Sequence, residues 1–196
     1  MKLPPFRIQR RRCAAAGYAL GRAGKETLHF PLPVPARLAI MDPNFHIAAN
    51  MRTFDTGDTG GLIDYAPDAL AAPLATALCL ADQKLRGLLD LPSLKFAIVV
   101  FSSLDPNDGG TLAALNRDLL WKAFGLPVFE QLRGWNGKVI ARECEVHNGL
   151  HLDASSQAAE WEGLSAVVEK AQCECGMETP RLCHLGGARA RAAAAA

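Results

Sequence analysis

The residues best suited to chemistry gather between positions 143 and 184. This segment contains four of the six cysteines and three of the five histidines, namely Cys144, Cys173, Cys175, Cys183, His147, His151 and His184. Thiolate and imidazole groups are the ligands that Zn²⁺ prefers in proteins, and four of them close a tetrahedral site. Cysteines clustered with histidines, in a chain without the pattern of a secretory leader, favour metal binding over a disulfide scaffold.

The spacing suggests a particular set of ligands. Cys173 and Cys175 form a Cys-x-Cys pair, and Gly176 lets the backbone fold back so that both thiolates reach one ion. Cys144, at the end of a predicted strand, and His151, seven residues later, supply the other two ligands. Four protein ligands leave no open coordination position, which predicts a structural site whose metal adds directly to the free energy of folding.

The fourth ligand stays open at this point. His147 could replace His151, and Cys183 or His184 could enter the site instead. The alternative without a metal is a group of reduced, partly buried thiols beside surface histidines. A pair of Cys-x-x-Cys motifs would be more specific than one Cys-x-Cys pair.

Composition narrows the classes of partner and compartment. The formal net charge is +1, from 21 basic and 20 acidic residues, which gives no reason to expect nucleic acid or an anionic membrane as partner. No apolar run reaches the roughly 18 residues that cross a bilayer. The arginines between positions 7 and 12 are not followed by an apolar segment, so no secretory signal is predicted. We therefore expect a cytoplasmic protein.

The chain divides into three parts by composition. Residues 1–36 are basic and rich in proline, which predicts a flexible arm. Residues 37–185 are expected to form a single α/β domain. Residues 186–196 are almost entirely alanine, arginine and glycine, which predicts a disordered tail.

Hydrophobic patterning predicts a small mixed sheet flanked by helices, with a zinc-knuckle-like turn near the C-terminus. Strands are expected at 37–41, 96–101, 128–130, 138–144, 149–152 and 181–183, with a polar loop at 55–61. A first helix is expected from Pro73 to about Pro92, with Leu74, Leu78, Leu85 and either Leu88 or Leu89 on its apolar face. A second is expected after an N-cap at Thr111, with Leu112, Leu115, Leu119 and Ala123 buried and Gly125 as its stop.

The strand, helix, strand succession between residues 96 and 130 predicts a βαβ unit. Asn136-Gly137 is a strong hairpin signal between the strands on either side. A third helix is expected from Asp153 or Ser155 to about Ala171, with Ala158, Trp161, Leu164 and Val168 on one side.

Several short motifs occur together in a recognisable order. They are residues 124–130 (Phe-Gly-Leu-Pro-Val-Phe-Glu), 143–145, 148–151, 173–176 and Pro180-Arg181. This succession resembles part of the phenylacetate–CoA ligase family of adenylate-forming enzymes, over roughly residues 94–185. The resemblance implies the large domain of an enzyme that activates an aryl acid with ATP and transfers it to coenzyme A. It also implies that Cys144, His151, Cys173 and Cys175 occupy structural positions, which supports zinc.

The catalytic motifs of that family are missing. The family carries an aromatic-Gly-x-Ser/Thr-Glu motif that helps to hold the adenylate and magnesium, but here the stretch 129–134 reads Phe-Glu-Gln-Leu-Arg-Gly. Residues 55–61 match its phosphate loop poorly, and the later ribose-binding aspartate and catalytic lysine have no counterpart. We therefore expect no independent ligase activity, and a possible role as an accessory module that binds a partner chain or a small acid.

Two alternatives stand beside this interpretation, a divergent ATP-dependent acid–CoA ligase and a purely structural zinc-binding interaction module. No catalytic and no cofactor-binding residue is assigned. Cys144 with His147 is disfavoured as a nucleophile and base, since three residues along a hairpin is not a recognised catalytic geometry. Glu143 and Glu145 are interpreted as solvated side chains. An active site, if present, is expected at the strand ends near Ser102 and Glu130.

Overall fold

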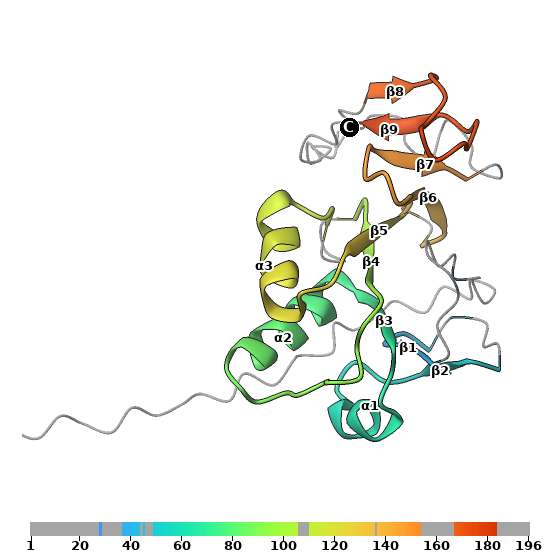
Figure 1. Cartoon of the computed structure of the whole chain (residues 1–196). Coiled ribbons are helices and arrows are strands. Elements are labelled where there is room, and N and C mark those ends of the chain that lie inside the picture. Colours follow the sequence, from blue (N-terminus) through green and yellow to red (C-terminus); the bar gives the residue numbers. More distant parts are fainter. Residues whose placement is uncertain are drawn as a thin grey trace, which may run out of the picture.

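The structure is a computed structural model that describes residues 28, 37–43, 45, 49–105, 110–135, 137–153 and 167–183. Its centre is a nine-stranded mixed sheet in the order β2-β1-β3-β4-β5-β6-β7-β9-β8. Figure 1 shows the sheet running through the molecule, from β2 and β1 to β9 and β8. The prediction of a mixed sheet is therefore confirmed, but the expectation that it is small is wrong.

Five strands form the parallel half of the sheet. They are β1 (Leu38–Ile40), β2 (Met51–Thr53), β3 (Ala69–Pro73), β4 (Ile98–Ser103) and β5 (Val128–Arg133). β3, β4 and β5 are buried along their whole length, as expected for parallel strands covered on both faces, although β5 also carries Glu130, Gln131 and Arg133. The antiparallel half adds β6 (Val139–Glu143), β7 (Leu150–Leu152), β9 (Arg181–Cys183) and β8 (Val167–Glu169).

Three helices occur among the described residues, α1 (Thr59–Tyr65), α2 (Leu74–Leu85) and α3 (Ala114–Phe124). All three contribute to one core cluster with side chains from β3, β4 and β5, so they cover the same face of the parallel sheet. Figure 1 shows α2 and α3 side by side on that face. A second cluster, which includes Phe45, Val99 and Phe101, lies on the opposite face, and a third lies against the antiparallel strands.

The predicted βαβ unit is confirmed. α3 connects β4 to β5, and these two strands pair in parallel from Ile98 with Val128 to Ser103 with Arg133. Gly125 ends α3 in the left-handed conformation, at φ 65°, as its position predicted. The hairpin between β5 and β6 is also confirmed, because these strands pair antiparallel and Gly137 has φ 78°.

Several predicted boundaries and faces are wrong. α2 ends at Leu85, well before Pro92, and its buried face consists of Leu74, Thr76, Ala77, Leu80 and Ala81. Leu85, at the end of α2, and Leu88, beyond it, are exposed, at 44% and 64%. α3 begins after Ala113 without a side-chain cap, so Thr111 is not its N-cap, and Leu115 is 81% exposed.

The prediction of a third helix is wrong over residues 167–169, the part of it that forms a regular element in the structure. Val167, Val168 and Glu169 form the edge strand β8, in agreement with the preference of β-branched residues for strands. The rest of that prediction, residues 154–166, lies outside the described residues. The polar loop at 55–61 is partly wrong, since α1 begins at Thr59 with the Asp58 side chain as its N-cap. β2, β3 and α1 were not predicted.

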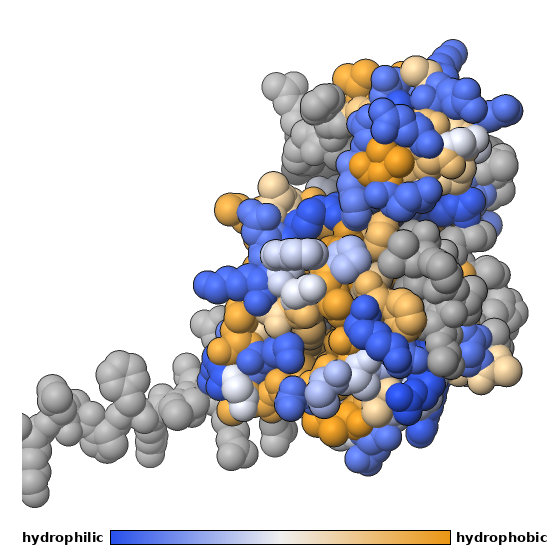
Figure 2. Space-filling model, in the orientation of Figure 1, coloured by the Kyte–Doolittle hydropathy of each residue, from blue (hydrophilic) through white to orange (hydrophobic). Residues whose placement is uncertain are grey.

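The predicted N-terminal arm lies outside the described residues except for Leu28, and the predicted tail lies entirely outside them. On the face shown in Figure 2, hydrophilic and hydrophobic side chains alternate over the described surface. None of the helices that the structure describes is long and apolar enough to cross a bilayer.

Candidate metal centre

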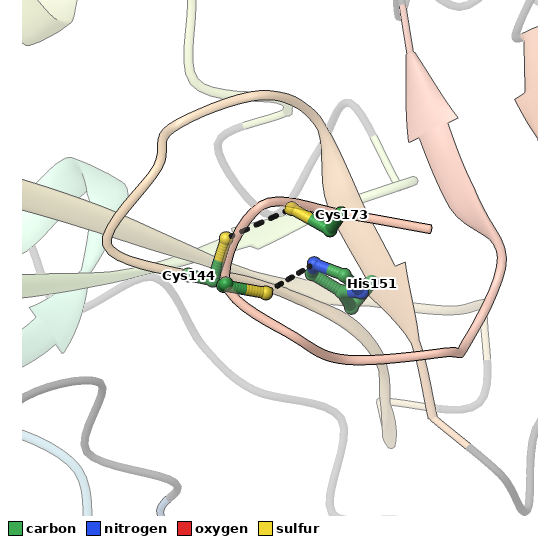
Figure 3. A group of neighbouring side chains, drawn as sticks. Cys144, His151 and Cys173 are labelled. Carbon is green, nitrogen blue, oxygen red and sulfur yellow. Dashed lines mark hydrogen bonds between the residues drawn. The ribbon is translucent and has the colours of Figure 1, made fainter. Parts of the chain in front are cut away.

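The structure brings the four expected ligand residues together. One ligand atom from each of Cys144, His151, Cys173 and Cys175 lies within 4.8 Å of every other. Cys144, His151 and Cys173 are buried, with exposed fractions of 2%, 1% and 4%. Figure 3 shows the side chains of these three residues converging from the end of one strand, a neighbouring strand and a loop.

The distances within the group fit a tetrahedral ion. Zn–S bonds of about 2.3 Å and Zn–N bonds of about 2.0–2.1 Å place two tetrahedral sulfurs about 3.8 Å apart, and a sulfur and a nitrogen about 3.6 Å apart. The Sγ atoms of Cys144 and Cys173 are 3.8 Å apart. The Sγ of Cys175 is 3.4 Å from Nε2 of His151. The donor set and its spacing therefore fit a closed Cys₃His site.

The backbone around the group explains how distant residues meet. Cys144 directly follows β6, His151 is the central residue of β7, and both thiols of the Cys-x-Cys pair lie in the turn between β8 and β9. In that turn the Gly176 N–H donates to the carbonyl of Cys173 over 2.9 Å, and Gly176 has φ 85°. Gly149, with φ 81°, precedes β7 and approaches β9 closely. Both glycines thus occupy a conformation that other residues rarely adopt.

A neighbouring residue orients the histidine ring. Nδ1 of His151 lies 3.1 Å from Oγ1 and 3.3 Å from the carbonyl oxygen of Thr179. Both oxygens can accept a hydrogen bond, so Nδ1 carries the proton and Nε2 keeps its lone pair directed at the thiols. A second hydrogen bond of this kind fixes the tautomer of metal-binding histidines.

The protein environment shifts the pKa values of three of the four proposed ligands. Burial raises the pKa of the Cys144 thiol to about 12. A hydrogen bond from the Cys175 backbone N–H lowers the pKa of Cys173. Burial lowers the pKa of His151, which favours the neutral ring that a metal requires. A divalent cation at the centre would favour the thiolate form of each cysteine.

The rival ligands lie elsewhere. Nδ1 of His147 is 3.0 Å from Oε1 of Glu143, and its ring stacks on Phe129 at 4.7 Å between centroids. Sγ of Cys183 donates to Oε2 of Glu169 over 3.4 Å, and burial raises the pKa of this thiol. His184 lies outside the described residues.

A network of polar side chains begins at Glu143, the residue before Cys144, and extends into the parallel sheet. The carboxylate of Glu143 accepts from the backbone N–H of Glu130 over 2.9 Å and from Arg117 over 3.0 Å. Glu130 in turn accepts from the Ser102 hydroxyl and from the Leu112 N–H. Glu143 is 7% exposed, so the expectation of a solvated carboxylate is wrong. Ser102 and Glu130, near which any active site was expected, are hydrogen bonded to each other and buried.

A cavity of about 400 Å³ lies beside this network. Its lining is Arg117, Asp118, Trp121, Pro127, Val128, Glu143 and His147. Because Val128 begins β5 and Glu143 ends the antiparallel β6, the cavity lies at the amino end of β5. Ligands of open α/β sheets bind at the other edge, outside the carboxyl ends of the parallel strands.

That carboxyl edge carries a buried ion pair. Arg133, the last residue of β5, donates to Asp42 after β1 over 2.9 Å. The guanidinium carbon lies 5.2 Å and 4.7 Å from the ring centroids of Phe45 and Phe101, which stack on one another. Arg133 is 7% and Asp42 3% exposed. A packed cation, carboxylate and aromatic pair thus join the ends of β1, β4 and β5.

The sequence analysis identified the four proposed ligands but missed the distant residues that contact His151, Glu143 and Arg133. Thr179 and Arg117 lie 28 and 26 residues from the side chains that they contact, and Asp42 lies 91 residues from Arg133. No local pattern marks such pairs. An arginine in the apolar segment 181–183 was a signal for a buried charge that needs partners.

Part of a solved CoA ligase structure has a similar fold. The chain is similar to the open conformation of 2-hydroxyisobutyryl-CoA ligase in complex with 2-HIB-AMP and CoA, with a TM-score of 0.51 and 12% sequence identity. The match covers 76% of this chain and 44% of that structure, so the chain spans less than half of its length. At this identity the similarity concerns the fold alone.

A second structure of 2-hydroxyisobutyryl-CoA ligase, in the postadenylation state with R3-HIB-AMP, matches with a TM-score of 0.41 and 14% identity, over 79% of this chain and 36% of that structure. No family model matches the sequence. No curated protein matches it either. The comparisons therefore show a similar fold and no family.

Proposed function

We propose that this chain is a zinc-stabilised α/β domain, related to the large domain of phenylacetate–CoA ligases, that lacks ligase activity of its own. The observation that supports zinc binding is the convergence of Cys144, His151, Cys173 and Cys175, whose ligand atoms lie within 4.8 Å of one another. Three thiolates and an imidazole suit Zn²⁺ better than a hard, oxygen-preferring cation. Four protein ligands define a structural ion that takes no part in a reaction.

Metal analysis of the purified protein tests this proposal. We expect close to one zinc per chain in protein prepared without chelator. Cys173→Ser combined with Cys175→Ser removes two ligands and should abolish the bound zinc. Cys183→Ser is the matched control, because Cys183 lies near the site but contacts Glu169 instead. Protein that contains no metal, or double-serine protein that keeps its zinc, would refute the site.

The absence of ligase activity is supported by the residues at the carboxyl edge of the sheet. Residues 129–134 lack the aromatic-Gly-x-Ser/Thr-Glu motif of the phenylacetate–CoA ligases. Arg133 from this stretch is buried, is paired with Asp42 and lies against the stacked rings of Phe45 and Phe101. A nucleotide bound at the ends of β1 and β5 would have to displace this packed pair.

A divergent ATP-dependent acid–CoA ligase is the competing proposal, favoured by the fold shared with 2-hydroxyisobutyryl-CoA ligase. Exchange of labelled pyrophosphate into ATP separates the two, with a panel of aryl acids and 2-hydroxyisobutyrate as substrates. We expect no exchange above the rate without enzyme. Robust exchange with any acid, lost when the acid is omitted, would establish the competing function.

Without ligase activity, the domain would serve as an accessory module in the cytoplasm, where reduced thiols persist. Its ligand would be a partner chain or a small acid, or its role would be that of a structural zinc-binding interaction module. Calorimetric titration with the same panel of acids tests the small-ligand form. Heat of binding in the absence of exchange would support an accessory binding role.

A further inference from the structure

Arg181 is a buried charge beside the proposed metal centre. It is the first residue of β9 and is 3% exposed. In the sheet it pairs with His151 of β7 on one side and with Glu169 of β8 on the other. A guanidinium removed from water needs specific partners, since burial of an uncompensated charge is costly.

The partners of Arg181 come from three separate segments. Its Nη1 donates to the carbonyl of Asn148 over 3.0 Å and lies 3.7 Å from Sγ of Cys173. Its Nη2 donates to Oε2 of Glu169 over 2.8 Å. Arg181 therefore connects the turn after β6, the Cys-x-Cys turn and β8. The first two of these segments flank or carry proposed ligands.

Charge gives the contact with sulfur a further role. Three thiolates, a neutral imidazole and a divalent ion sum to a net charge of −1, and the centre is largely buried. The Arg181 side chain is 4% exposed, so its positive charge acts through protein, whereas Glu169 is 43% exposed and its charge is screened by water. A cationic N–H donor to a thiolate stabilises the charged form of the sulfur.

We propose that Arg181 is a positioning residue for the metal centre, which holds the Cys173 thiolate in place and sets the affinity of the Cys₃His site. This inference rests on the proposed zinc binding. Residues that contact a ligand rather than the metal typically change metal affinity by about 10- to 100-fold when they are replaced. Arg181→Met should therefore weaken zinc binding by about that factor in a chelator competition.

Cobalt substitution gives a readout that a merely structural role would not move. Loss of the N–H donor raises the energy of the sulfur lone pairs, so the thiolate-to-cobalt charge-transfer band of Arg181→Met should shift to longer wavelength. Arg142→Met is the matched control. Arg142 lies opposite His151 on the other neighbouring strand, β6, and makes no hydrogen bond to a thiol among the described residues. Its replacement should leave the band unchanged and should change the affinity much less than Arg181→Met does, because Arg142 contacts no thiol.

Arg181→Lys covers the case in which the methionine variant fails to fold. Lysine keeps the charge but cannot reproduce the planar fork that serves three partners, so an intermediate loss of affinity and a smaller band shift are expected. Wild-type protein that binds no zinc would refute the proposed function itself. If the wild-type protein binds zinc but the folded Arg181 variant has the same affinity and cobalt spectrum, only the role of Arg181 is refuted. Equal effects of Arg142→Met would also refute it, because they would indicate a general effect of charge.

Discussion

At the scale of single residues, Gly149 occupies a position that only glycine fits. Its φ is 81°, and a Cβ atom built there would lie 2.8 Å from the Leu182 carbonyl oxygen and 2.8 Å from Sγ of Cys183. The left-handed conformation costs an ordinary residue about 1–2 kcal/mol, and the close contact with β9 adds to this cost. Gly149→Ala should therefore lower the free energy of unfolding by more than the conformational cost alone, as measured by urea titration.

Gly137 is the matched control for this prediction. It has φ 78° in the β5–β6 hairpin, but no atom lies within 4 Å of a Cβ built on it. Gly137→Ala should therefore show the cost of the conformation without the contact. Equal losses of stability in the two variants would mean that β7 and β9 are not held as closely at Gly149 as the structure indicates.

Glu130 is a residue whose protonation should be visible in the stability of the whole domain. Burial raises its pKa, while its hydrogen bonds with Ser102 and the Leu112 N–H act in the opposite direction. In the pH window from the pKa of the unfolded chain up to the higher folded pKa, the folded protein binds more protons than the unfolded chain. The contribution of Glu130 is thus fully present below the unfolded pKa and is lost as the pH rises through the folded pKa.

Glu130→Gln removes this dependence, because the amide keeps an acceptor oxygen and carries no charge. In urea titrations between pH 4 and pH 8, the unfolding free energy of the wild type should fall relative to that of the variant as the pH rises. Parallel pH profiles for the two proteins would show that Glu130 keeps an ordinary pKa in the folded state.

At the scale of elements, the proposed ion is expected to stabilise the antiparallel half of the sheet by linking its strands. Its ligands lie after β6, in β7 and in the turn between β8 and β9, and each of these strands is short. The parallel strands have their own core beneath α2 and α3. Removal of zinc with a chelator should therefore increase amide hydrogen exchange in β7, β8 and β9, with little change in β3 and β4. Exchange measured by mass spectrometry resolves these segments.

Uniform deprotection of all strands on chelation would contradict that prediction and make the ion a requirement for the whole fold. Unchanged hydrogen exchange in β7, β8 and β9 would show that the ion does not stabilise the antiparallel half of the sheet. Replacement of the chelator by its zinc-saturated form is the control for effects of the chelator on the protein.

The elements found from sequence are those with strong local signals. The apolar run of β4, the glycine that ends α3 and the Asn-Gly hairpin all act through neighbouring residues, and each was predicted. β2 and β3 were missed because Met51–Thr53 and Ala69–Pro73 carry no distinctive alternation and are set by pairing with β1. The helix expected near Val168 failed because pairing with β9 overrode a helical period.

Within the proposed metal site, too, features with a local sequence signal were predicted, and features set by tertiary contacts were not. The types and spacing of the cysteines and His151 are visible in the sequence, and the structure brings them together. Thr179 and Arg181 act through the register of β7 with β9, which no spacing along the chain reveals. Rivals such as His147 were excluded only by their contacts with Glu143 and Phe129. Tertiary contacts, rather than composition, decide which histidine faces the thiols.

At the scale of the whole molecule, the ion pair of Arg133 with Asp42 joins segments 91 residues apart, at the ends of β5 and β1. Loss of one partner from a buried pair leaves the other charge in a poor environment, at a cost of about 3–5 kcal/mol. Arg133→Met and Asp42→Asn should each lower the free energy of unfolding by about this amount. The double variant should lose clearly less than the sum, which gives a large coupling energy in a double-mutant cycle.

The exposed pair of Arg86 with Asp82 on α2 supplies the comparison. Its atoms are 3.1 Å apart, but its side chains are 53% and 61% exposed, so a cycle there should give a coupling of about 0.3–0.5 kcal/mol at most. Urea titrations of the wild-type protein and of the two single variants and one double variant of each pair measure both cycles. Because β3 and β4 lie between the two strands that Arg133 and Asp42 terminate, a large coupling means that the carboxyl edge of the parallel sheet is held as one packed unit. A coupling as small as that of the surface pair would mean that this edge is loosely held, and it would remove the packing argument against a nucleotide bound there.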